Sequence, residues 1–302
     1  MDEPGLLVPL TVDEDPSLPS ISVNGTQLHA ESFGNPNDPM LVALHGGPGG
    51  DYRYLLNCAE FVNDGFFVVM YDQRGSGLSK RHDEKIYTVQ LFIDDLDAVI
   101  HHYRKDSAQK IFLLGQSWGA MLATAYVNQN PGKISGLVLA EPGGFTWKDT
   151  KDYIERFQTL QLFDEASNDF VYLDQFVTGD DHRVLDYKAG LMAAADFAEG
   201  NKTGVEGLEP NWRFGAICHK ASLDYAEKYG FDFTTNLNQF NTKVLFVYSE
   251  LNEAYGKKHA EKVSSVYPNV QLEEILGQGH EMTYFGWNKF YPLAKNYLNE
   301  VK

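Results

Sequence analysis

The sequence of 302 residues has no apolar run of eighteen residues, and its first residues, Met1 to Gly5, include neither a basic region nor an apolar stretch. A transmembrane helix needs such a run and a secretory signal needs both features, so neither is expected in these residues. The sequence as it stands predicts a soluble, cytoplasmic protein. A signal ahead of these residues would instead indicate an exported or periplasmic one.

Basic residues are scarce, because 25 Lys and Arg stand against 42 Asp and Glu and give a formal net charge of −17. They form no cluster that could neutralise phosphates, so nucleic acid is excluded as an expected partner. High solubility is the favoured explanation for the negative charge, and a cationic partner is the alternative. No pattern in the sequence indicates an oligomeric state.

Cysteine is also rare: Cys58 and Cys218 lie far apart in the sequence and form no metal-binding motif. Two free, buried thiols are the favoured interpretation, and one disulfide is the alternative after export. No metal ion and no cofactor are expected.

Short, fully apolar segments alternate with segments of helical periodicity along most of the chain. A hairpin is predicted at 20–33, because Asn24-Gly25 favours a type I′ turn. Further strands are predicted at 40–44, 66–71, 110–114, 134–140, 243–248 and 270–276, and helices at 55–62, 88–103, 120–130, 257–266 and 287–301. This alternation predicts an α/β protein with a mostly parallel central sheet flanked by helices on both faces. Ligands bind such sheets at the carboxyl ends of the strands.

The pattern changes between residues 145 and 241, where apolar residues recur at helical spacing and no buried strand appears. Two examples are the groups Tyr153, Ile154, Phe157, Leu160 and Phe170, Leu173, Phe176, Val177. We expect this segment to be a helical cap inserted after the sixth core strand, with the core formed by 20–144 and 242–302. Residues 1–19 are expected to be an N-terminal extension whose polar, proline-containing sequence would suit a tether.

The segment Gly115-Gln-Ser117-Trp-Gly119 lies between a predicted strand and a predicted helix. A G-x-S-x-G pattern in this context is typical of a nucleophile elbow, a tight turn that exposes the serine at the sheet edge. Glycines suit the flanking positions, because side chains there would clash with the neighbouring backbone. Ser117 is therefore the candidate nucleophile.

A serine nucleophile needs a base and donors for the oxyanion. His280 follows the last predicted strand, so the loop that carries it can bring the imidazole over Ser117. The expected donors are the backbone N–H of Trp118 and one from Gly46 or Gly47, in the glycine-rich loop after strand 40–44.

Four motifs resemble those of the proline iminopeptidase group of α/β-hydrolase-fold proteins. They are His45-Gly-Gly-Pro-Gly49, Asp72-Gln-Arg-Gly-Ser-Gly-Leu-Ser79, Gly115-Gln-Ser-Trp-Gly119 and Gly279-His280. The resemblance covers the core and implies hydrolysis through an acyl-enzyme, with release of N-terminal proline or another small apolar residue from a short peptide. It implies a small-molecule or short-peptide substrate.

The acid that orients His280 departs from this family. The resemblance puts the acid after strand 243–248, where this chain has Asn252. An amide cannot offset the charge of an imidazolium, so a carboxylate elsewhere is more useful. Glu141, directly after strand 134–140, is the favoured candidate, and Glu253 and Glu250 are the alternatives.

The substrate-binding residues are less well indicated. The resembled family anchors the substrate amine with cap carboxylates, and the candidates in this chain are Asp180, Asp181, Glu206 and Glu209. Trp118, Trp212 and Phe145 are expected either to line an apolar pocket or to pack in the core. Asp72 and Arg74 are expected to be structural, satisfying polar groups of adjacent loops.

The sequence therefore predicts a serine hydrolase, with an aminopeptidase of the proline iminopeptidase type as the leading interpretation. A carboxylesterase or lactonase acting on small esters would use the same residues. Dehalogenase and epoxide hydrolase chemistry is excluded, since it normally needs an aspartate where this chain has Ser117. A non-catalytic binding protein of this fold is the alternative from another class, and Asn252 is the feature that favours it.

Overall fold

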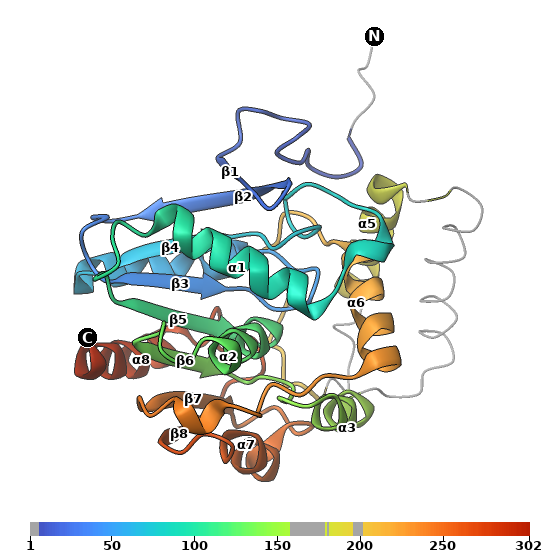
Figure 1. The fold of residues 1–302 in the computed structure, drawn as a ribbon. Helices are drawn as coiled ribbons and strands as arrows, with labels where there is room; N and C mark the ends of the chain where they lie inside the picture. Colours follow the sequence, from blue (N-terminus) through green and yellow to red (C-terminus); the bar gives the residue numbers. More distant parts are fainter. Residues whose placement is uncertain (1–5, 158–178, 180, 196–201) are drawn as a thin grey trace.

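The computed structural model describes residues 6–157, 179, 181–195 and 202–302. Its centre is an eight-stranded sheet with the order β1-β2-β4-β3-β5-β6-β7-β8 (Figure 1). β1 and β2 form the expected hairpin and β2 pairs antiparallel with β4, whereas all further pairings are parallel. The strands are Ser20–Val23, Thr26–Phe33, Met40–Leu44, Phe67–Tyr71, Ile111–Gln116, Gly136–Ala140, Val244–Ser249 and Val270–Ile275, numbered in that order. The predicted, mostly parallel sheet is confirmed.

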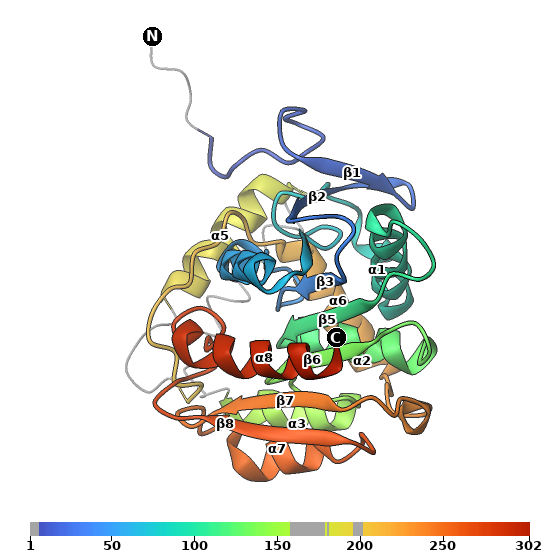
Figure 2. The same ribbon diagram turned by 90° about the vertical axis from the view of Figure 1, so that its left-hand side faces the viewer.

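Helices cover both faces of this sheet, as predicted. The central strand β3 shows why, because Leu41 and Ala43 face one apolar core while Met40, Val42 and Leu44 face the other. α1 (Val89–Tyr103), α2 (Trp118–Gln129) and α7 (Gly256–Ser264) cover one face. The 3-10 helix η1 (Arg53–Asp64) and α8 (Trp287–Val301) cover the other (Figure 2). A second 3-10 helix, η2 (Glu84–Ile86), precedes α1.

The segment between β6 and β7 carries helices that lie beyond the ends of the strands, on the side where the label of α6 stands in Figure 1. They are α3 (Trp147–Phe157), α5 (His182–Ala195), α6 (Ala216–Tyr229) and the 3-10 helix η3 (Leu237–Gln239). The predicted helical spacing from Phe170 to Val177 lies outside the described residues. We interpret 145–241 as the cap, and this division of the chain stays a prediction.

The N-terminal residues from Val8 to Glu14 are docked against the rest of the protein. Arg213 Nη1 donates to Pro9 O at 2.9 Å, and Arg183 Nη2 donates to Glu14 Oε1 at 2.6 Å. Val12 is 2% exposed, and its N–H donates to Leu78 O at 2.8 Å. This part of the extension is therefore not a free tether, because its backbone and side chains are bonded to the core and to α5 and its neighbours.

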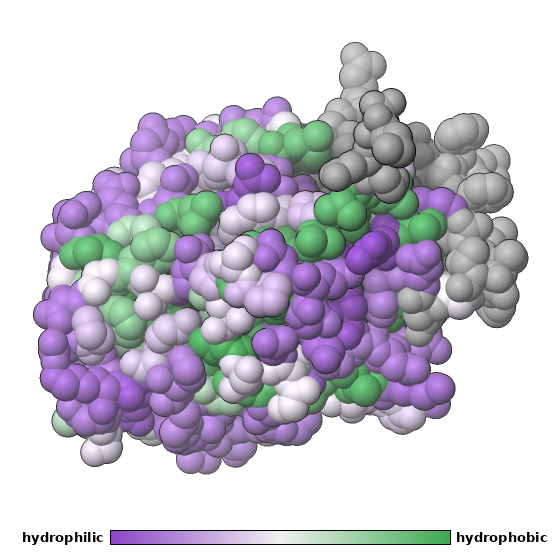
Figure 3. Space-filling view, turned by 90° about the horizontal axis from the view of Figure 1, so that it is seen from above, coloured by the Kyte–Doolittle hydropathy of each residue, from purple (hydrophilic) through white to green (hydrophobic). Residues whose placement is uncertain are grey.

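Both cysteines are free and buried, in agreement with the favoured interpretation. Burial raises the pKa of each thiol to about 12. Within the described ranges, no helix is long and apolar enough to cross a membrane. Figure 3 shows a mainly hydrophilic face with scattered apolar patches.

Candidate active site

The nucleophile elbow forms where β5 runs into α2. Ser117 has φ 54° and ψ −121°, a strained conformation for a residue with a side chain, and its N–H donates to Ala140 O at 2.8 Å. The flanking glycines are required by space, because a Cβ on Gly115 would meet Gly119 and a Cβ on Gly119 would meet Leu44 O. This local packing explains the G-x-S-x-G pattern in the sequence.

A carboxylate holds the candidate base. His280 Nδ1 lies 2.6 Å from Glu141 Oε2, and the Glu141 side chain is 0% exposed. Ser249 N and Ser249 Oγ donate to Glu141 Oε1 at 2.8 and 2.6 Å, and Asn252 Nδ2 donates to Oε2 at 2.9 Å. Both oxygens of Glu141 are therefore bonded on two sides, which fixes the orientation of the carboxylate toward the imidazole. Ser249 and Asn252 were not predicted as its partners.

The other two carboxylates considered for this position lie elsewhere. Glu250 is exposed and accepts a hydrogen bond from Gly277 N at 2.8 Å. Glu253 is exposed beside a separate surface hollow near α7. Neither has a hydrogen bond to His280 in the part of the chain that the structure describes.

The environment of His280 sets its basicity. Burial pushes the pKa of His280 down, but the hydrogen bond to Glu141 and the negative charges of Glu281 and Glu141 outweigh it, so this pKa lies above the usual value for histidine. Nδ1 is bonded to Glu141, so Nε2 is left for the serine. Ser117 and His280 border the same cavity. No hydrogen bond joins them among the described residues, which is common in unliganded sites.

The glycine-rich loop expected to supply an oxyanion donor, here called the oxyanion loop, follows β3, and two of the three donor positions considered have no partner among the described residues. Gly46 N donates to Tyr54 Oη at 2.7 Å, so this N–H is already used. Within the described residues, the N–H groups of Gly47 and Trp118 have no hydrogen-bond partner, and both residues border the cavity. The geometry therefore favours Gly47 over Gly46 as the donor from this loop.

Tyr54 also links the loop to the rest of the site. Its hydroxyl donates to Gln116 Oε1 at 2.7 Å, and Gln116 Nε2 donates to His280 O at 3.2 Å. This chain of bonds joins the oxyanion loop, the residue before Ser117 and the loop of His280. Gln116 lies inside the elbow motif, so the sequence indicated that it is near the site, whereas no sequence pattern indicated this for Tyr54.

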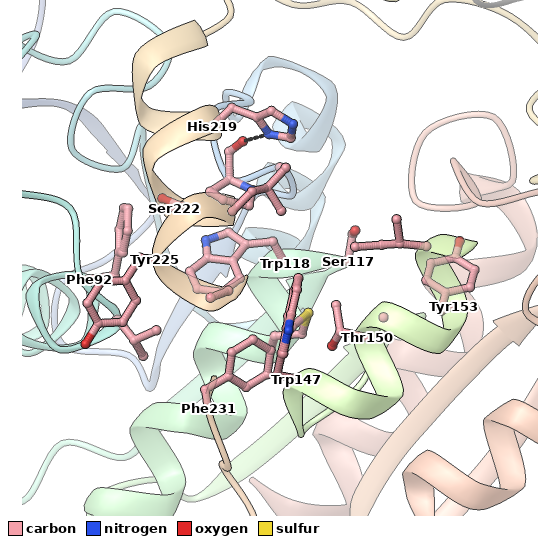
Figure 4. A pocket seen from close by; sticks show the side chains of 18 of the residues that line it. Phe92, Ser117, Trp118, Trp147, Thr150, Tyr153, His219, Ser222, Tyr225 and Phe231 are labelled. Carbon is pink, nitrogen blue, oxygen red and sulfur yellow. Dashed lines mark hydrogen bonds between the residues drawn. The ribbon is translucent and has the colours of Figure 1, made fainter. Parts of the chain in front are cut away.

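A cavity of about 320 Å³ opens at Ser117 and His280 and extends between α1, α3 and α6 (Figure 4). Its walls are mainly aromatic or aliphatic; the largest lining side chains are those of Tyr87, Phe92, Trp118, Met121, Trp147, Tyr153, Tyr225 and Phe231. Of the three pocket candidates from the sequence, Trp118 lines this cavity. Trp212 instead packs on His29 and Tyr52, and Phe145 is buried against Phe246 and Tyr267, so for these two the core interpretation holds.

Of the cap carboxylates expected to anchor an amine, the three that the structure describes, Asp181, Glu206 and Glu209, do not border this cavity. Asp180 lies outside the described residues, and Asp181 and Glu206 are exposed. Glu209 lies beside Glu281, the residue after His280; burial and then the charge of Glu281 raise the pKa of Glu209 well above its usual value. The raised pKa favours the protonated form of Glu209, because its ionisation would place two like charges together.

Asp72 and Arg74 have the predicted structural role. Asp72 accepts hydrogen bonds from Tyr52 N at 3.0 Å and Leu78 N at 2.8 Å. Arg74 pairs with Asp95 at 2.8 Å. These bonds fix the loop after β4 and leave neither side chain for chemistry at Ser117.

The sheet order, the serine elbow and the histidine loop together define an α/β-hydrolase fold. The family model described as serine aminopeptidase, S33, matches residues 35–188, which is just over half of the chain, and the protein belongs to this family. It is a hydrolase family, which agrees with the resemblance seen in the sequence.

Curated relatives match over shorter stretches. A proline iminopeptidase of Lactobacillus helveticus (strain DPC 4571) is 40% identical over 106 residues, which is 34% of this chain and 35% of that relative. A proline iminopeptidase of Saccharolobus solfataricus is 35% identical over 147 residues, 44% of this chain and 46% of the relative. The matches thus span about a third to a half of the relatives' lengths.

Solved structures share the fold over nearly the whole chain. The proline iminopeptidase of Mycobacterium smegmatis has a TM-score of 0.64 at 19% identity, covering 94% of this chain and 98% of its own. Est816, described as an N-acyl homoserine lactone degrading enzyme, has a TM-score of 0.63 at 18% identity, covering 92% and 99%. At these identities the likeness is one of fold.

Proposed function

We propose that this hydrolase acts through an acyl-enzyme formed on Ser117. His280, held by Glu141, takes the proton from Ser117 Oγ as the oxygen attacks a carbonyl carbon. The N–H groups of Gly47 and Trp118 donate to the oxyanion that develops. The observation that carries this proposal is the 2.6 Å contact of His280 with a buried, fully bonded carboxylate beside the serine elbow.

The steps balance without any further group. Collapse of the tetrahedral intermediate breaks the bond to the leaving amine or alcohol, which takes the proton from His280. Water then gives a proton to His280 and attacks the acyl-enzyme, and the return of that proton to Ser117 Oγ releases the acid. Glu141 takes part in none of these proton transfers and stabilises the imidazolium.

The leading substrate class is a short peptide with an apolar N-terminal residue. The family description and the names of the relatives support an aminopeptidase. An aminopeptidase also needs a counter-charge for the substrate ammonium. Neither Glu209 nor Glu281 lines the cavity, but Glu281 directly follows His280, so we assign this role to the Glu209–Glu281 pair, because an ammonium group can bridge two neighbouring carboxylates.

A carboxylesterase or lactonase is the second candidate, and the cavity favours it. Among the residues that the structure describes around Ser117, the cavity lining includes no Asp, Glu, Lys or Arg side chain. A neutral acyl group would bind there without desolvating a charge. A non-catalytic binding protein is disfavoured, since the feature that suggested it, Asn252, is used to hold Glu141.

The test compares the rates of hydrolysis of three substrates, with Ser117→Ala as the blank. They are L-leucine p-nitroanilide, the p-nitroanilide of 4-methylpentanoic acid, which differs only in lacking the amine, and the ester p-nitrophenyl butyrate. Labelling by a fluorophosphonate shows whether Ser117 is activated. An aminopeptidase cleaves the amine-bearing anilide at least tenfold faster, and the double variant Glu209→Gln, Glu281→Gln loses this preference. Cleavage of the ester alone supports the esterase, and no cleavage and no labelling rejects the hydrolytic mechanism.

A further inference from the structure

The cavity beside Ser117 has aromatic walls from two separate parts of the chain. Phe92 and Trp118 come from α1 and α2 of the core, whereas Trp147, Tyr225 and Phe231 belong to or adjoin α3 and α6 (Figure 4). The rings that line the space therefore come both from the core and from the segment between β6 and β7.

These rings pack on one another in pairs. Phe92 and Trp118 are close to perpendicular with centroids 5.6 Å apart, and Trp147 and Phe231 have centroids 5.9 Å apart. Trp118 Nε1 donates to Gln73 Oε1 at 2.8 Å, so the polar atom of this indole is already satisfied. The cavity is thus preorganised, and the surface that it offers is largely carbon.

The volume of the cavity decides which group fits. About 320 Å³ would hold roughly ten water molecules at about 30 Å³ each. A proline ring or an alanine methyl group would leave much of this space to water against apolar walls, which is unfavourable. A benzyl or indolyl group would fill more of it and could pack edge-to-face on the rings.

We propose that the enzyme prefers substrates whose acyl part carries a bulky aromatic side chain, rather than proline or another small residue. This inference rests on the proposed function, which places the acyl group of the substrate in the cavity beside Ser117. An aminopeptidase needs an enclosed site for one residue and an open path for the rest of the peptide. The preference itself does not depend on whether an amide or an ester is cleaved.

Ala226 offers a sharp test, because it borders the cavity from α6 and is 6% exposed. A leucine there would shorten the cavity. Asp224, on the same helix with its side chain 64% exposed, gives the matched control Asp224→Leu. Phe231→Ala, in contrast, enlarges the cavity.

The experiment measures kcat/KM for the p-nitroanilides of proline, alanine, leucine, phenylalanine and tryptophan, and for p-nitrophenyl acetate and 3-phenylpropanoate. In each series, we expect kcat/KM for the aromatic substrates to exceed kcat/KM for the proline, alanine or acetate substrate by at least tenfold. The reason is that each added buried carbon group strengthens binding. Ala226→Leu should reduce kcat/KM for the aromatic substrates at least tenfold more than kcat/KM for the alanine and acetate substrates. Asp224→Leu should change nothing.

The inference is overturned if kcat/KM for the proline and alanine substrates equals or exceeds that for the aromatic ones. It is also overturned if Ala226→Leu lowers kcat/KM equally for all substrates, or if kcat/KM depends on the leaving group and not on the acyl group. If only the esters react, the aminopeptidase proposal fails while the size preference is still read from them. If nothing reacts, tryptophan fluorescence is used to measure the binding of 3-phenylpropanamide and of acetamide to the protein. Equal affinity for the two amides rejects the inference.

Discussion

Asn252 donates its side-chain amide to Glu141 Oε2 at 2.9 Å, and the same oxygen lies 2.6 Å from His280 Nδ1. The amide orientation is fixed, because Asn252 Oδ1 accepts from Tyr255 N at 3.1 Å. Only the NH₂ group can then face Glu141. An aspartate at 252 would place a second carboxylate against Glu141. The carboxylate at position 141 therefore favours an uncharged hydrogen-bond donor, such as the amide of Asn252, at position 252.

This relationship predicts that Glu141→Gln abolishes most activity while Asn252→Ala has a smaller effect. The substituted glutamine would present an amide to His280 and remove the charge that stabilises the imidazolium, so kcat should fall about 10³–10⁴-fold. Asn252→Ala removes one of four bonds to the carboxylate, and kcat should fall about tenfold. Steady-state kinetics with any substrate that is turned over measures both, and circular dichroism checks that each variant folds.

Asn252→Asp gives the matching control. In the wild-type background the two carboxylates would repel each other, so activity should fall. In the Glu141→Gln background the new carboxylate can contact the imidazole, so the double variant should be more active than Glu141→Gln. If Asn252→Asp alone raises activity, Glu141 is not the orienting acid.

The pH dependence of activity should respond to Glu281. Catalysis needs neutral His280, so kcat/KM falls as the pH drops through the pKa of His280, which lies above the usual value for histidine. The charge of Glu281 contributes to that upward shift. Glu281→Gln should therefore lower this pKa and move the acid limb to lower pH. An ester without an amine is the substrate, which separates this effect from amine binding, and an unmoved or upward-shifted limb contradicts the assignment.

The sequence alone predicted the strands and helices, the elbow and the histidine loop, because each depends on residues close together in the chain. Whether Glu141, Glu250 or Glu253 contacts His280 could not be decided, since Glu141 and Asn252 meet only through the pairing of β6 with β7. The hydrogen bond from Gly46 N to Tyr54 was missed for a similar reason, because a tyrosine at the start of a helix does not by itself indicate a role in the site.

The pocket shows the same limit. No pattern in the sequence distinguishes Trp147 from Trp212 as a cavity residue. The packing of the segment between β6 and β7 places Trp147 at the cavity, whereas Trp212 packs on Tyr52. The glycine spacing, by contrast, was informative because backbone clashes are local.

A buried ion cluster should stabilise the segment between β6 and β7. Asp186 is buried and accepts from Arg81 Nε at 2.9 Å, Arg213 Nε at 2.7 Å and Ala216 N at 2.9 Å. Asp186→Ala leaves two largely buried arginines without this partner, so the free energy of unfolding should fall by about 3–5 kcal/mol. Urea denaturation measures it. Glu227→Ala, which breaks an exposed ion pair with Lys151, should have no measurable effect.

The elbow should tolerate no side chain at Gly119. A Cβ there would meet Leu44 O and come within 2.7 Å of His45 O, and both are backbone atoms of the strand and loop beside it, which cannot move aside without opening the sheet. Gly119→Ala should therefore lower the free energy of unfolding by more than about 3 kcal/mol and abolish labelling of Ser117 by a fluorophosphonate.

Gly132→Ala is the matched control for this change, because nothing lies within 4 Å of a Cβ at that exposed turn and its backbone is not in the left-handed region. Its stability should stay within about 0.5 kcal/mol of the wild type, with labelling unchanged. A Gly119→Ala variant with wild-type stability and full labelling would mean that the backbone at the elbow is freer than the close approach of Leu44 O implies. The strain at Ser117 would then not be imposed by its neighbours.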